Sequence, residues 1–162
     1  MLPNYRSPPR RTRELVDQSG VASAAVTGTL ALVEVRSVPI PKLGPNDCIV
    51  LHCQWKFVGT VGTKSVRAYL GGLAGAAVVW YTAAATLTRL ADERRIQNKT
   101  VTNLQSVSQA HGSIGYATST GADNDTAIET KDGTTITFAA QLTDAADQAI
   151  LKSWSIEIIR AN

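Results

Sequence analysis

The chain has 162 residues, 44% of them hydrophobic and 18% charged, and a net charge of +3; this length suits one domain with a buried core. No uninterrupted apolar run is long enough to span a bilayer, and the polar, proline-containing start lacks the apolar segment of a secretory signal. We therefore expect no membrane association, and a protein that stays in the cytoplasm where it is made or leaves it by lysis.

Residues 1–28 are predicted to form an extended basic arm outside the folded body. Prolines at positions 3, 8 and 9 disfavour both helix and strand pairing. The stretch 4–15 holds one acid, Glu14, and four arginines: Arg6, Arg10, Arg11 and Arg13. Removing these from the 16 basic and 13 acidic residues of the chain leaves 12 of each. The folded body is thus expected to be neutral, and the arm to carry the net charge.

The body, residues 29–162, begins with a predicted strand over 29–38. The clearest strand follows over 48–57, where apolar and polar residues alternate. One face holds Ile49, Leu51, Cys53, Trp55 and Phe57, and the other holds Cys48, Val50, His52, Gln54 and Lys56. This alternation predicts that Trp55 lies in the core.

Two further strands are predicted over 64–72 and 76–86. The first places Val66, Ala68 and Leu70 inward and ends at a glycine pair. The second is apolar on both faces, which is typical of a strand covered on both sides. We therefore expect an oligomer interface at this strand, formed by Val78, Val79, Trp80 and Tyr81.

The last third of the body is also predicted to be β-structure. Residues 85–98 could form a strand or a short helix, and the alternation favours a strand. The turn residues Lys131, Asp132 and Gly133 predict a hairpin over 126–142. The final segment, 149–162, places four apolar side chains on one face: Ile150, Trp154, Ile156 and Ile158.

About eight short strands separated by turns, with no βαβ pattern, predict an all-β fold. The expected architecture is an antiparallel β-sandwich, specifically a jelly roll, with the extended N-terminal arm attached.

The polar residues indicate no catalytic or metal site. The cysteines Cys48 and Cys53 lie on opposite faces of one strand, so they cannot form a disulfide with each other. With His52 and His111 they give no metal-ligand spacing and no nucleophile motif. The acids near residues 123–129 could serve as a glycosidase pair or a calcium site, but a solvated loop is the favoured interpretation. We expect neither enzymatic activity nor a cofactor.

The arm arginines admit three interpretations. They could bind nucleic acid through its phosphates, anchor the protein on an acidic neighbouring subunit, or belong to a frayed, solvated terminus. A neutral body argues against nucleic acid, because phosphate binding usually uses a basic face as well.

Several segments resemble a β-sandwich domain found in structural proteins of tailed bacteriophages. The pattern covers residues 43–159, with Glu129 and Lys99 replacing an aspartate and an arginine of the pattern. The first matching elements are the Gly44-Pro45-Asn46 turn and a strand that contains Lys64, Arg67, Gly71 and Gly72. The others are the segments Gln97 to Lys99, Asn103 to Val107, Thr126 to Thr130, Gln141 to Asp147 and Leu151 to Glu157. The N-terminal arm, residues 1–28, lies outside this pattern.

The resemblance implies a homotrimeric virion protein made in the cytoplasm of a bacterial host, and it brings no catalytic residues. The expected role is a capsid decoration protein (a cement or head protein) that uses Arg6, Arg10, Arg11 and Arg13 to anchor on the major capsid protein. The alternative role is a tail fibre protein, or a fibre-tail adaptor, bound to tail proteins and presenting a surface to the host or to a fibre. A glycan-active enzyme and a nucleic-acid binder are the less favoured alternatives.

Overall fold

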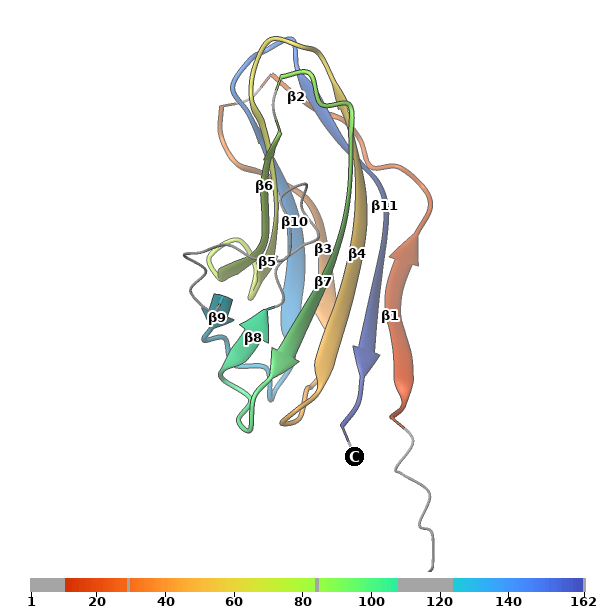
Figure 1. Ribbon diagram of the computed structural model, residues 1–162, viewed down its shortest axis with the longest axis vertical. Coiled ribbons are helices and arrows are strands. Elements are labelled where there is room, and N and C mark those ends of the chain that lie inside the picture. Colours follow the sequence, from red (N-terminus) through yellow and green to blue (C-terminus); the bar gives the residue numbers. More distant parts are fainter. Residues whose placement is uncertain (1–10, 29, 84, 108–123, 162) are drawn as a thin grey trace, which may run out of the picture.

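The computed structural model describes residues 11–28, 30–83, 85–107 and 124–161, and within them the fold is two antiparallel sheets packed face to face (Figure 1). The larger sheet has the order β1 (Arg13–Ser19), β11 (Gln148–Ile159), β4 (Cys48–Val58), β7 (Arg89–Asn98), β8 (Gln105–Val107) and β9 (Asn124–Thr126), with β2 (Val26–Thr27) also paired to β11. The smaller sheet has the order β3 (Val33–Ile40), β10 (Thr134–Leu142), β5 (Lys64–Leu70) and β6 (Ala76–Ala83). The predicted all-β antiparallel sandwich is therefore confirmed.

The core lies between the two sheets, and β4 and β10 supply much of it. The five alternating residues of β4, from Ile49 to Phe57, are each at most 2% exposed, as predicted. They face fully buried side chains of the smaller sheet: Val66, Ala68, Leu70, Ile136, Phe138, Ala140 and Leu142. Burying a large side chain in such a core contributes about 1.5–3 kcal/mol, so the two sheets hold each other in place.

The N-terminal region differs from the prediction, because most of residues 13–27 belongs to the sandwich. Strand β1 pairs with β11 along its length, and β2 pairs with the beginning of β11. Val16 packs against the core, and the Trp154 indole nitrogen donates a hydrogen bond to Asp17 at 3.1 Å. The three prolines all precede β1, so this stretch was free to pair as an edge strand. The separate arm can therefore extend no further than residue 12, and residues 1–10 lie outside the described residues.

The predicted hairpin over 126–142 is also wrong, although its turn is present. Gly133 has φ of 96°, a conformation that favours glycine, and its amide donates to the Thr130 carbonyl. The segment before the turn ends in the larger sheet as β9, whereas β10 pairs with β3 and β5 in the smaller one. The turn therefore connects the two sheets rather than two paired strands.

A β-bulge in β11 explains one misplaced residue. The register to β4 shifts between Leu151 and Ser153, so that Lys152 is an extra residue. An inserted residue reverses the alternation that follows it. Before the bulge the inward residues are Ala149 and Leu151, and Ile150 is only half-buried, contrary to the prediction. After it, Ile156 and Ile158 are buried as predicted.

The strand over 85–98, for which a helix was the alternative, is β7, as the favoured interpretation predicted. No helix that could cross a membrane occurs in the described part of the chain.

Candidate functional site

Several polar residues of the pattern described above are one another's partners in this structure. Lys64 and Asp147 form an ion pair of 3.3 Å in which both side chains are fully buried. The Lys64 ammonium also donates hydrogen bonds to the Gly62 and Ala85 carbonyls, each at 3.1 Å. Together with Asp147, these give the ammonium group three acceptors. Arg67 donates to the Gln141 side chain at 3.2 Å. Each pair joins two separate segments of the pattern.

The loop between β4 and β5 is built around Asp147. The Gly62 amide donates to its carboxylate at 2.8 Å. A side chain at Gly59, where φ is 89°, would place its Cβ 2.1 Å from the carboxylate, and one at Gly62 would place it 2.9 Å away. Both glycines are therefore required for this close approach. Burial alone would raise the pKa of Asp147, but the hydrogen bonds from Gly62 and Lys64 hold it below its ordinary value.

A second network joins four other segments of the pattern at the opposite end of the sandwich. The Asn98 amide donates to the Gly44 carbonyl and to the Thr130 hydroxyl, both at 2.9 Å. The Gln105 amide donates to Asn98 and to the Ile128 carbonyl, while its oxygen accepts from the Ile128 amide. Asn98, Gln105 and Thr130 are all buried, so these contacts satisfy groups that would otherwise be costly to bury.

A third cluster fixes β1 and the C-terminal residues to this same end. Arg160 contacts Glu14 at 2.8 Å and Asp47 at 3.0 Å. Burial opposes ionisation of Asp47, but hydrogen bonds from the Gly44 and Ala161 amides and from Arg160 keep its pKa below the ordinary value. Glu14, the one acid in the basic N-terminal stretch, is thus part of the folded body.

The arginines predicted to anchor a partner do not form one group. Arg13 lies on β1 with its side chain 61% exposed, and it pairs with Glu157 of β11 at 3.2 Å. Arg11 is exposed, two residues before the start of β1. Arg6 and Arg10 lie outside the described residues.

The predicted oligomer interface is in part core. Val78 is 4% exposed and Val79 is 1% exposed, because a register shift in the β5–β6 pairing makes Val78 an extra residue and both valines are buried within the chain. Tyr81 packs partly buried against the core, and the Trp80 side chain is outside the described residues. The two valines are therefore not available to another subunit.

The cysteines and His52 lack catalytic surroundings. Both thiols are free and buried, and burial raises the pKa of Cys53 to about 12 and also raises that of Cys48. A buried thiol of high pKa is a poor nucleophile. His52 is half-buried on the outer face of β4, 3.8 Å from Glu93. Within the described part of the chain, no group of three histidine, cysteine or acidic residues could hold a metal ion.

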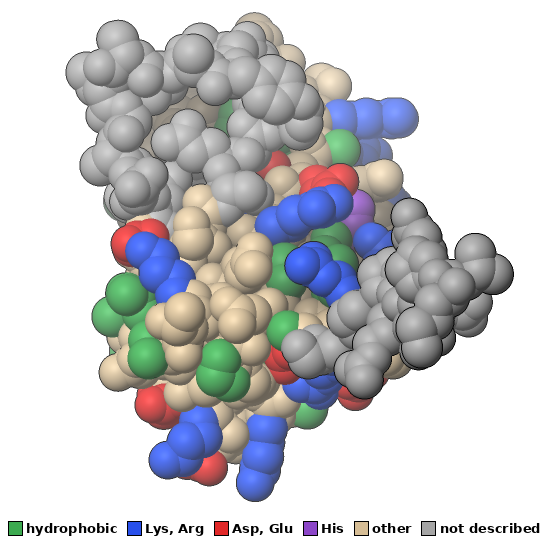
Figure 2. Space-filling view, turned by 60° about the horizontal axis from the view of Figure 1, so that its bottom comes forward, with side chains coloured by type: hydrophobic (Ala, Val, Ile, Leu, Met, Phe, Trp, Pro, Cys, Tyr) green, Lys and Arg blue, Asp and Glu red, His purple; other side chains and the backbone are tan. Residues whose placement is uncertain are grey.

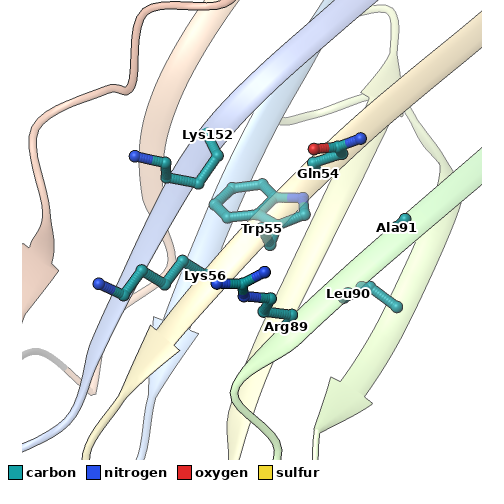
Figure 3. Close-up of a pocket in the computed structure, with 7 residues that line it drawn as sticks. All are labelled: Gln54, Trp55, Lys56, Arg89, Leu90, Ala91 and Lys152. Carbon is teal, nitrogen blue, oxygen red and sulfur yellow. The ribbon is translucent and has the colours of Figure 1, made fainter.

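A cationic hollow of about 410 Å³ on the outer face of the larger sheet was not predicted from the sequence (Figure 3). Its lining includes three exposed basic residues from three adjacent strands: Lys56 of β4, Arg89 of β7 and Lys152 of β11. None of the ion pairs found among the described residues involves these three. Figure 2, which turns the lower end of the molecule forward, shows basic side chains beside acidic ones on that face.

No protein-family model matches the chain, and no curated protein matches it. Among solved structures, a Bacillus endospore appendage from a family of disulfide-linked pili is 14% identical, with a TM-score of 0.38 and coverage of 99% of this chain and 100% of that one. The VP2 subviral particle of infectious bursal disease virus is 12% identical, with a TM-score of 0.36 and coverage of 93% and 32%.

The Gt strain of the same virus is also 12% identical, with a TM-score of 0.38 and coverage of 99% and 36%. This chain thus spans about a third of the length of the two viral chains. At these identities and TM-scores the likeness does not extend to function.

Proposed function

We propose that the chain is a structural protein of a bacteriophage virion, specifically a capsid decoration protein anchored by its N-terminal segment. The observation that carries this proposal is the mutual pairing of the pattern residues, above all Lys64 with Asp147 and Asn98 with Thr130. Residues far apart in the chain that meet only in the folded sandwich are the ones that resemble the bacteriophage domain. This supports a shared architecture, used here for assembly.

The strand order supports the jelly-roll form of the sandwich. Four long strands of the larger sheet follow the order β1, β11, β4, β7, and the smaller sheet follows β3, β10, β5, β6. The chain changes sheet before β3, β4, β5, β7, β10 and β11. A jelly roll has eight strands in two such sheets, and we infer that this sandwich is one.

The anchor is the segment that precedes β1, and its basic groups are Arg6, Arg10 and Arg11. Arg13 lies on β1 and pairs with Glu157 at the surface, so it is placed outside this segment. Arginine pairs bidentately with carboxylates, which suits an acidic surface of the major capsid protein. Because β1 is hydrogen-bonded to β11, a load on this segment is transmitted directly into the larger sheet.

The homotrimer is proposed to form at the edge of the smaller sheet. Within the described residues, β6 pairs only with β5, so its other edge has no strand partner there. Uncovered apolar edge strands tend to pair with other chains. The contact would therefore involve the edge of β6 and not the buried Val78 and Val79.

The experiment that tests this function locates the protein in particles. Particles from the host that encodes the chain are purified on a density gradient and labelled with an antibody against residues 29–162. We expect label distributed over the head. Label at the tail alone would replace the decoration role with the tail role, and particles free of the protein would contradict a virion function.

A further inference from the structure

Two like charges lie directly opposite each other on the outer face of the larger sheet. Lys56 of β4 and Arg89 of β7 are register partners, and both side chains are exposed. Opposed like charges on neighbouring antiparallel strands destabilise a sheet. Neither residue belongs to an ion pair among the described residues, so this placement does not serve the stability of the fold.

A β-bulge adds the third cation to the same place. Lys152 is the residue inserted between the Leu151–Trp55 and Ser153–Gln54 pairs of β11 and β4. Bulges are frequent next to binding sites because they redirect a side chain. Figure 3 shows Lys152, Lys56 and Arg89 on three neighbouring strands around one hollow.

The remaining lining supplies groups of a different kind. Gln54 offers an amide that can donate and accept hydrogen bonds, and its register partner Ala91 offers a small exposed apolar surface. The hollow, at about 410 Å³, falls in the size range of small-ligand sites. Three cations, one amide and a small apolar patch match a sugar ring that carries an acidic group. The sugar hydroxyls would contact Gln54, and a C–H face of the ring would lie on Ala91.

We propose that this hollow binds an acidic saccharide, whose carboxylate or phosphate group contacts Lys56, Arg89 and Lys152. The inference does not depend on the virion role.

The same face argues against a long polyanion such as nucleic acid. Further along β4 and β7, away from the hollow, Glu93 lies opposite His52 with its side chain 46% exposed. Glu157 of β11 lies beyond it, opposite Val50. Glu93 is paired with Arg95 and Glu157 with Arg13. The charges of this face are therefore compensated beyond the hollow, and its cations that have no ion pair among the described residues suit a compact ligand. The arginine-containing N-terminal segment is excluded as an occupant by its own charge.

The test uses the full chain and amide NMR spectra, with four probes: glucuronic acid, glucose 6-phosphate, glucose and inorganic phosphate. The acidic sugars are expected to shift the amide signals of Gln54, Lys56, Arg89 and Lys152 at millimolar concentration, and glucose is expected to shift none. Lys56→Gln/Arg89→Gln should weaken binding about tenfold or more, because two charge-assisted contacts are lost. Lys42→Gln removes an exposed charge from another loop and should leave binding unchanged.

A second variant separates binding from folding. Lys56→Glu places opposite charges across the β4–β7 pair, so its melting temperature should rise while binding of both acidic sugars is lost. The proposal fails if neither acidic sugar shifts these amides. It also fails if inorganic phosphate binds as tightly as glucose 6-phosphate, because the hollow would then recognise no sugar, or if binding survives in the Lys56→Gln/Arg89→Gln variant.

Discussion

Lys64 and Asp147 form an ion pair in which both side chains are fully buried, with the ammonium nitrogen and a carboxylate oxygen 3.3 Å apart. The pair joins β5 to the loop that precedes β11, and it is surrounded by the Gly59–Gly62 loop. Breaking a buried pair leaves an uncompensated charge, whereas replacing both partners with apolar residues is often tolerated.

We expect Lys64→Met to lower the free energy of unfolding far more than Lys99→Met does. Lys99 pairs with Asp125 at the surface, where an ion pair contributes about 1 kcal/mol at most. Lys64→Met/Asp147→Leu should recover much of the loss. Urea denaturation of the three variants and the parent measures this. Equal effects of the two single substitutions would show that the buried pair contributes no more to the free energy of unfolding than a surface pair does.

Acid should destabilise the protein through Asp47 and Asp147. Both carboxyls have a pKa below the ordinary value of 3.8 in the folded state. A lowered folded-state pKa contributes stability that is present above the unfolded-state pKa and is lost as the pH falls through the folded-state pKa. The melting temperature should therefore decrease when the pH is lowered below about 4. Asp47→Asn should melt below the parent at pH 7 and converge with it in acid; a constant gap at all pH values would contradict this.

Both cysteines should be unreactive in the native protein and reactive after unfolding. Cys48 and Cys53 are free and buried, and the pKa of Cys53 is about 12. A thiol reagent at pH 8 should therefore find neither thiol in the folded chain and two thiols in denaturant without reductant. Fewer than two after unfolding would indicate a disulfide and would overturn the arrangement of β4.

The sequence indicated the fold most clearly where each strand alternates regularly. In β4, alternation alone identified Trp55 as a core residue, which is 2% exposed. It failed at Ile150, because the bulge at Lys152 leaves no mark in the pattern. The strand β1 was missed because its polar side chains are matched by distant partners, as Asp17 is by Trp154.

The candidate sites could be predicted less well than the fold. Lys56, Arg89 and Lys152 come together only through the strand order β7, β4, β11, and local patterns do not determine which strands are neighbours. The alternation did place Lys56 on the outer face. The pattern residues were recognised as segments, but the pairing of Lys64 with Asp147 depends on two loops meeting at one end of the sandwich.

The proposed homotrimer should be disrupted by a charge on the open edge of β6. Thr82 is exposed on this strand, whereas Thr86 is exposed just beyond it. A lysine on an edge strand opposes pairing with another chain. In sedimentation at micromolar concentration we expect a trimer for the parent and for Thr86→Lys, and smaller species for Thr82→Lys. A monomeric parent would contradict the trimer.

Incorporation of an arm-deleted protein into particles tests the virion role most directly. The deletion of residues 2–12 leaves β1 intact, since β1 begins at Arg13, and a companion variant replaces Arg6, Arg10 and Arg11 with glutamine. Both proteins should fold and sediment like the parent. We predict that the deletion abolishes incorporation into purified particles and that the glutamine variant reduces it strongly. Normal incorporation of the deleted protein would contradict anchoring by the N-terminal segment.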